Sequence, residues 1–93
     1  MSNRESETNA LILDVSAQLE ERIAALRRIA VADPEAAIEV GIRVTENLGE
    51  APIALTSVGR ELARIASNHR WLTEFEVRNM DDSAFEAYCE HLS

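Results

Sequence analysis

The chain contains no lysine, and all nine of its basic residues are arginine. Lysine is one of the commonest residues of soluble proteins, so its absence excludes every mechanism that needs a primary amine on a side chain. Those mechanisms include a phosphate loop completed by lysine, a Schiff-base intermediate and regulation by lysine acetylation. We attribute the bias itself to an arginine-rich genome and not to a function.

Cysteine, histidine and glycine are also scarce. The single cysteine, Cys89, cannot form an intramolecular disulfide, which fits a reducing compartment. His69, Cys89 and His91 are the only soft metal ligands, and the last two would point about 200° apart on a helix. No third group is marked that could orient a Cys89–His69 pair for nucleophilic catalysis, and three glycines leave no glycine-rich phosphate loop. The sequence therefore predicts no metal, no cofactor and no enzymatic activity.

Long apolar runs are missing as well. No stretch approaches the roughly 20 apolar residues that cross a bilayer. The acidic opening MSNRESETN lacks the basic and then apolar order of a signal peptide. We therefore expect a soluble, cytoplasmic protein without a membrane segment.

What is present is a composition typical of one globular domain. The chain has 93 residues, of which 46% are hydrophobic and 28% charged. We expect residues 1–8 to form a frayed polar segment and residues 9–93 to form a single helical domain. The net charge of −8 argues against direct binding of nucleic acid, because contacts to phosphates supply most of that affinity.

The clearest helix signal lies between Asp33 and Gly49. Asp33 can cap the helix, Pro34 suits its first position, and Gly49 can take the left-handed conformation that closes it. Its apolar side chains spread over about 200° of the circumference, so we expect this helix to lie between others and to be the most buried. Gly41 faces inward, where it either lets a second backbone approach or is simply tolerated. The apolar set is Ala37, Ile38, Val40, Gly41, Ile42, Val44, Thr45 and Leu48.

An apolar stripe precedes that helix and predicts one long first helix from about Asn9 to Ala32. Its members recur every three or four residues: Ile12, Val15, Leu19, Ile23, Leu26 and Ala30. Such a helix would be about 35 Å long, more than one partner helix can cover. Either later helices stack along it or a second copy of the chain covers the excess, so we expect a homo-oligomer.

The rest of the chain predicts one further long helix and two short ones. The third helix should begin near Pro52, or failing that at Thr56 or Ser57, and stop at Asn68. Residues 71–77 could alternate as a strand, but Thr73 and Glu76 form a capping box, which favours a short helix over 74–79. Asp81 provides a similar start signal for a final helix over 82–92. The predicted fold is all-α, a compact bundle of four to five helices with a long first helix and short C-terminal helices.

Two surface features are candidates for binding. All four aromatic residues fall in the last quarter, where they can serve either as core or as interface anchors. The final helix carries Asp82, Glu86 and Glu90 at four-residue spacing, a stripe that is either a docking surface or a solvated face.

The function that fits these features is a small acidic protein-binding module. It would be either a self-associating adaptor or an inhibitor of a basic partner protein, such as one that handles nucleic acid. Its size and charge match the type of bacterial or phage inhibitors, although no motif supports that comparison. The candidate partner-binding residues are Leu19, Arg22, Trp71, Asp82, Glu86 and Glu90.

One alternative stays open at the level of sequence. Residues 60–77 offer a helix, a short turn and a second helical stretch, the order of a helix-turn-helix DNA-binding regulator. Its basic surface would use Arg60, Arg64, Arg70 and Arg78. Against it, the turn lacks glycine, and Glu74 and Glu76 stand where a recognition helix would meet phosphates.

Overall fold

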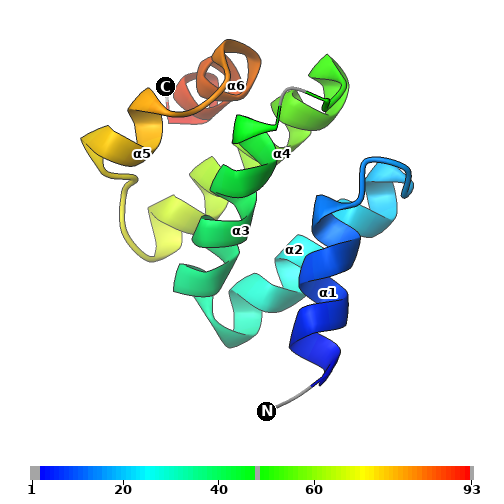
Figure 1. Cartoon of the computed structure of the whole chain (residues 1–93). Helices are drawn as coiled ribbons and strands as arrows, with labels where there is room; N and C mark the ends of the chain where they lie inside the picture. The colour runs from blue at the N-terminus through cyan, green and yellow to red at the C-terminus, as the bar shows by residue number, and fades with distance from the viewer. Residues whose placement is uncertain (1–2, 48, 93) are drawn as a thin grey trace.

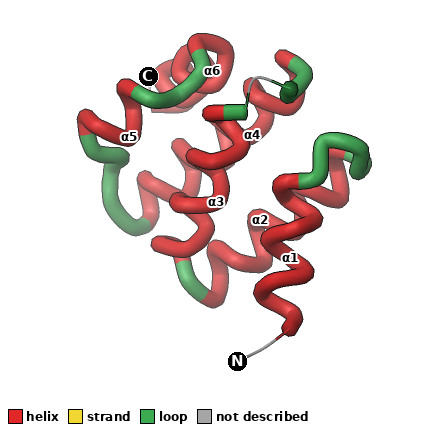
Figure 2. Tube along the Cα trace, viewed as in Figure 1, coloured by secondary structure: helices red, strands yellow, loops and turns green. Residues whose placement is uncertain are grey.

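The computed structural model describes the backbone of residues 3–47 and 49–92, and the side chains of residues 8–47 and 49–91. Within these ranges the chain forms α-helices and no strand, so the predicted all-α class is confirmed (Figures 1 and 2). The described ranges contain six helices, where four to five were expected. They are α1 (Asn3–Leu13), α2 (Leu19–Ala32), α3 (Pro34–Glu46), α4 (Pro52–Asn68), α5 (Glu74–Arg78) and α6 (Asp82–Leu92).

The predicted long first helix is wrong, because the chain leaves the helix at Leu13 and starts a new one at Leu19. The Asp14 carboxylate accepts hydrogen bonds from the backbone N and the Oγ of Ser16, at 2.9 and 2.6 Å. Local bonds of this kind compete with the helix for the backbone. The two helices fold back on each other as a hairpin (Figure 1), and Val15 points into solvent at the turn. The first of them begins at Asn3, earlier than the expected Asn9.

Helix α3 lies between α1, α2 and α4, as its broad apolar face predicts. The Asp33 carboxylate accepts a hydrogen bond from the backbone N of Ala36, and Pro34 occupies the first turn. Val40 and Val44 are buried, whereas Leu48 falls outside the described residues. The predicted left-handed glycine at the end of the helix is wrong, because no described glycine has a positive φ. The Gly49 backbone N instead donates to the Asn47 side chain.

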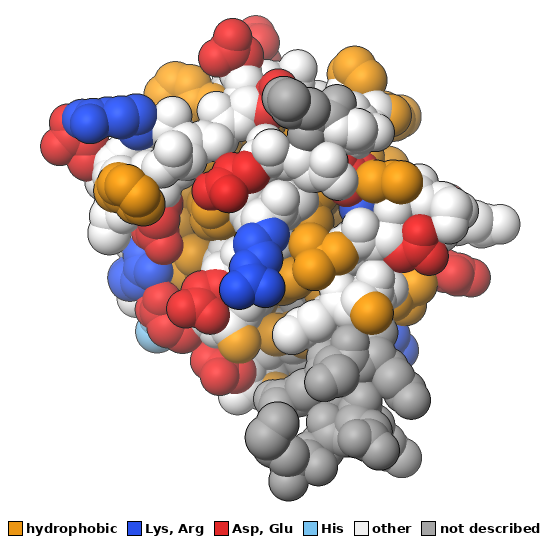
Figure 3. Space-filling view, in the orientation of Figure 1, with side chains coloured by type: hydrophobic (Ala, Val, Ile, Leu, Met, Phe, Trp, Pro, Cys, Tyr) orange, Lys and Arg blue, Asp and Glu red, His pale blue; other side chains and the backbone are white. Residues whose placement is uncertain are grey.

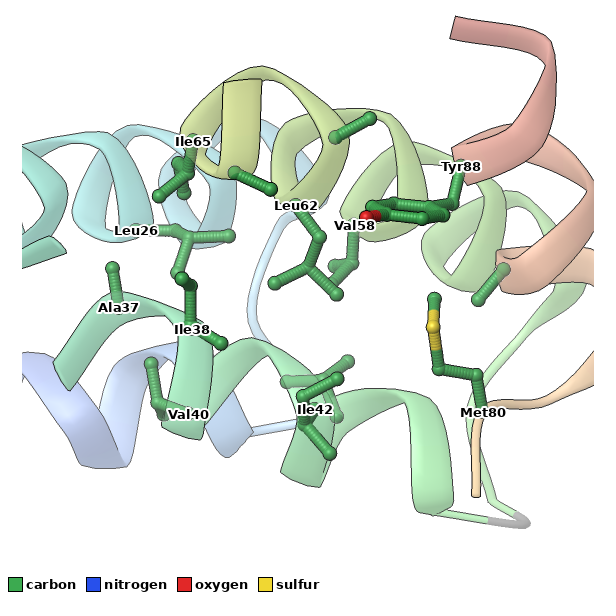
Figure 4. Packing of buried hydrophobic residues seen from close by; sticks show 14 of the residues in the cluster. Leu26, Ala37, Ile38, Val40, Ile42, Val58, Leu62, Ile65, Met80 and Tyr88 are labelled. Carbon is green, nitrogen blue, oxygen red and sulfur yellow. The ribbon is translucent and has the colours of Figure 1, made fainter. Parts of the chain in front are cut away.

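Two glycines allow the close packing of the core. A Cβ on Gly41 would lie 2.6 Å from the Cδ2 of Leu62, so Gly41 admits a side chain and not the backbone that the sequence suggested. The backbone approach occurs at Gly59, where a Cβ would lie 2.3 Å from the carbonyl oxygen of Ala84. Helix α6 therefore packs directly on α4, and Leu62 sits at the centre of the apolar cluster (Figure 4).

The C-terminal helices follow their predicted start signals. The capping box of Thr73 and Glu76 is present, and α5 ends one residue earlier than expected. The Asp81 carboxylate accepts a hydrogen bond from the backbone N of Ser83 at the start of α6. The Tyr88 hydroxyl accepts one from the backbone N of Leu72, which fixes the loop before α5 on α6. Across the described part of the chain, no helix combines the length and the apolar character needed to cross a bilayer.

Candidate interaction surfaces

The six candidate partner-binding residues do not form one surface. Leu19 is half-buried on α2 and Arg22 is buried, whereas Trp71 is exposed in the loop before α5. The other three, Asp82, Glu86 and Glu90, are exposed on α6. We call these three carboxylates the α6 acidic face.

Arg22 belongs to the interior of the molecule. Its Nε donates to the carbonyl oxygen of Ile12 at 2.8 Å, and its two terminal nitrogens donate to the two carboxylate oxygens of Glu50. The side chains of this ion pair are only 4% and 1% exposed. Arg22 thus ties together the end of α1, helix α2 and the loop before α4, and it presents nothing to a partner.

The α6 acidic face consists of carboxylates spaced one helical turn apart. None of the three forms an ion pair with any described residue. Two arginines lie beside them: Arg78 shares one hollow with Asp82, and Arg60 lines, together with Glu86 and Glu90, a shallow hollow of about 240 Å³ between α4 and α6. No ion pair closes that hollow, so the negative charge of the face remains available to a second molecule.

One exposed aromatic side chain, Phe85, lies beside this face. Phe85 is 40% exposed and, with Asp82 and Met80, lines a second hollow of about 230 Å³. Trp71 and Phe75 are 56% and 74% exposed, whereas Tyr88 alone of the four aromatics is buried. Figure 3 shows acidic, basic and apolar side chains interspersed over the face of the molecule that is seen in Figure 1. The sequence could not show which aromatic side chains are buried and which are exposed, because all four lie in helical or loop segments with a similar pattern of polar and apolar residues.

The arginines of the DNA-binding alternative are mostly paired within the chain. Arg64 bonds to Glu61, and Arg78 bonds to Glu74. Arg70 bridges two glutamates from different parts of the chain, as described below. Of the four, Arg60 alone makes no ion pair with a described residue, and α5, the would-be recognition helix, is five residues long. The four arginines therefore do not form the free basic patch that phosphate contacts require.

A surface ion cluster joins the start of α3 to the loop after α4. The Arg70 guanidinium donates to Glu35 at 2.6 and 2.8 Å and to Glu76 at 2.9 and 3.1 Å, and His69 lies 3.0 Å from Glu35. The hydrogen bonds from Arg70, and secondly from His69, lower the pKa of Glu35 from 4.5 to about 2. The bond from Arg70 also lowers the pKa of Glu76.

This cluster predicts an acid-sensitive contribution to stability. A carboxyl whose pKa is lower in the folded chain stabilises the fold above its unfolded value of 4.5, and that contribution is lost as pH falls towards about 2. Glu35→Gln should therefore lose less stability than the parent between pH 4.5 and 2, measured by urea melts at several pH values. Glu39→Gln, an exposed glutamate of the same helix, should keep the parental pH dependence. Equal slopes for the parent and Glu35→Gln would contradict the assignment.

The described residues contain no group of three or more histidine, cysteine, aspartate or glutamate side chains placed to hold a metal ion. Comparisons with protein-family models, with curated proteins and with solved structures find no match for this chain.

Proposed function

We propose that this chain is a non-catalytic protein-binding module whose α6 acidic face binds a basic surface on another protein molecule. The observation that carries the proposal is a stripe of three exposed carboxylates, one helical turn apart on α6, beside the exposed side chain of Phe85. The exposed glutamates of α2 and α3 (Glu20, Glu21, Glu39 and Glu46) also lack an ion pair with a described residue, but they do not form three successive carboxylates at one-turn spacing. Glu35, Glu50 and Glu61 are held by arginines of the same molecule. The three carboxylates of α6 have no such partner among the described residues.

The arrangement of these carboxylates supports a role in recognition. Like charges one turn apart on a helix repel each other and destabilise it by a few tenths of a kcal/mol per pair. A basic partner surface would remove that repulsion, and opposite charges on two proteins also steer them together before contact.

The exposed aromatics supply the apolar part of the proposed interface. Phe85 lies on the same helix as the α6 acidic face, and Trp71 is exposed in the loop that Tyr88 anchors on α6. Aromatic residues are enriched among the side chains that carry most binding energy at interfaces. An acidic stripe with an exposed aromatic side chain at its edge matches a partner whose surface combines arginine or lysine with an apolar hollow.

Two other functions predicted from the sequence, self-association through a long first helix and DNA binding, lose support. The expectation of self-association rested on the excess length of a single first helix, and the break after Leu13 removes that reason. The DNA-binding alternative loses support because the charges of Arg64, Arg70 and Arg78 are each shared with a glutamate, and because α5, which would have to serve as the recognition helix, is five residues long.

The proposal predicts salt-sensitive binding that depends on α6. The tagged full chain is used to recover a partner from the native host, and the association rate of that partner is then measured over increasing salt. Charge reversal by Glu86→Arg with Glu90→Arg should slow association at least about tenfold, an effect that fades as salt screens the charges.

The control for this experiment is Glu39→Arg with Glu46→Arg, which makes the same change of net charge at two exposed positions of α3. It should leave most of the association rate intact. If both double variants slow association equally, overall charge and not the α6 acidic face attracts the partner. Trp71→Ala tests the aromatic contribution separately, and it should act on the dissociation rate.

A further inference from the structure

We infer that the molecule bound by the α6 acidic face is a second copy of this chain, which receives α6 in a hollow between its own α2 and α4. This inference rests on the proposed binding role of α6 and adds the identity of the partner. We call the receiving site the α2/α4 hollow; it has a volume of about 320 Å³. Its lining residues are Arg27, Ala30, Val31, Pro34, Arg64, Ile65, Asn68 and His69.

The charge of the hollow is opposite to that of the molecule. Two arginines line it and no carboxylate does, although the chain as a whole carries a net charge of −8. The α6 acidic face has the opposite excess, with three carboxylates beside two arginines, Arg60 and Arg78, of neighbouring elements. One chain therefore exposes two surfaces of complementary charge.

A buried glutamate holds the two arginines in place. Arg27 donates to Glu61 at 3.2 and 2.9 Å, and Arg64 donates to it at 3.1 and 2.8 Å, in each case through Nε and Nη2. The Glu61 side chain is 9% exposed. Burial acts to raise its pKa, but the bonds from Arg27 and Arg64 outweigh burial and lower it. Glu61 is therefore ionised, and it neutralises only one of the two positive charges.

The arginines retain capacity for a second carboxylate ligand. Their side chains are 60% and 44% exposed, and the Nη1 group of each makes no hydrogen bond within the described structure. A guanidinium that is already fixed by one carboxylate loses less conformational freedom when it binds another, and its planar fork suits carboxylate oxygens. Two guanidiniums that share Glu61 stand close together, and Glu86 and Glu90 present two carboxylates one turn apart to meet them.

Apolar side chains complete the match. Val31 is 89% exposed at the rim of the hollow, beside Ala30 and Ile65, although an aliphatic side chain gains nothing from that exposure. Phe85 is 40% exposed on α6 next to the acidic face. Docking α6 would remove apolar surface on both copies from water while the charged groups pair around it.

A single copy cannot make this contact with itself. Helix α6 packs on the side of α4 that carries Gly59, whereas Arg64, Ile65 and Asn68 lie about 140–240° around the same helix. The α6 of one copy must therefore enter the hollow of another. Such head-to-tail contacts build rings or open chains, because each copy offers one acidic face and one hollow.

The test is a charge exchange between two variants of the full chain, followed by sedimentation equilibrium over a range of concentrations. Wild type should show an average mass that rises above that of one chain as concentration increases. The α6 variant, Glu86→Arg with Glu90→Arg, and the hollow variant, Arg27→Glu, should each associate at least about tenfold more weakly, because like charges now face each other. The hollow variant retains the ion pair of Arg64 with Glu61. Circular dichroism checks that both variants remain folded.

Mixing the two variants distinguishes specific contact from general charge effects. The α6 variant offers a basic helix to the acidified hollow of the other, so the equimolar mixture should associate again. Arg28→Glu and the α3 variant Glu39→Arg with Glu46→Arg are the matched controls, and both should associate like the wild type.

Three results would overturn the inference: a single-chain mass at every concentration, association that neither variant weakens, or weakened association that mixing does not restore. The proposed function fails separately. The chain could remain a single molecule while a host partner still binds it in a salt-sensitive manner that needs Glu86 and Glu90. In that case the proposed binding function is retained, and the partner is a different protein.

Discussion

Val44→Asp should abolish the cooperative unfolding transition of this protein. Val44 has no exposed surface, and it lies on the helix that packs against α1, α2 and α4. A carboxylate at that position would be buried without a partner, at a cost of several kcal/mol after relaxation. A domain of this length has a total stability of about 5–14 kcal/mol, so the loss of packing together with the buried charge removes most of it.

The same substitution at an exposed valine provides the control. Val15 lies in the loop between α1 and α2 and is 53% exposed, so Val15→Asp should change stability by no more than about 0.5 kcal/mol. Urea unfolding followed by far-ultraviolet circular dichroism measures both variants. A Val44→Asp variant that unfolds like the parent would mean that this side of α3 faces water.

Breaking the buried ion pair of Arg22 and Glu50 should cost about 3–5 kcal/mol, because either single change leaves the other charge buried without its partner. Glu50→Leu leaves the Arg22 guanidinium buried without its partner. Arg22→Met leaves the Glu50 carboxylate buried without its partner and also removes the donor to the carbonyl oxygen of Ile12. The double variant should lose much less stability than the sum of the two, although the Ile12 carbonyl still costs about 1–3 kcal/mol when left without a donor.

A double-mutant cycle measured by urea unfolding gives the coupling energy directly. The exposed pair of Arg78 and Glu74, whose side chains are 72% and 88% exposed, is the reference. Its cycle, with Arg78→Met and Glu74→Leu, should show a coupling of no more than about 0.5 kcal/mol. If the Arg22–Glu50 cycle gives an equally small value, the pair does not hold α1, α2 and the α3–α4 loop together.

Local sequence determined most of the helix ends. Asp33 with Pro34 started α3, Pro52 started α4, and the capping box at Thr73 started α5, each as predicted. These signals are reliable because the groups involved lie within four residues of each other along the chain. The break after Leu13 is also local, but its signal in Asp14 and Ser16 was hidden by an apolar spacing that continues across the turn.

For some of the candidate binding residues the sequence was likewise sufficient to predict exposure, and for others it was not. The spacing of Asp82, Glu86 and Glu90 was sufficient to place them on one exposed face of α6. The same kind of pattern could not show that Trp71 is exposed while Tyr88 is buried. Nor could it show that Arg22 is internal, or that Arg27 and Arg64 share Glu61.

Tertiary structure decided those questions because each partner comes from a distant part of the chain. Arg22 meets Glu50 across 28 positions, and Arg27 meets Glu61 across 34. The sequence by itself determined an acidic, all-α chain with a charged stripe on its last helix. Only the packing of α2 and α6 on opposite sides of α4 decided which charges are neutralised inside the molecule and which remain exposed, because a charge is paired by whatever the fold brings beside it.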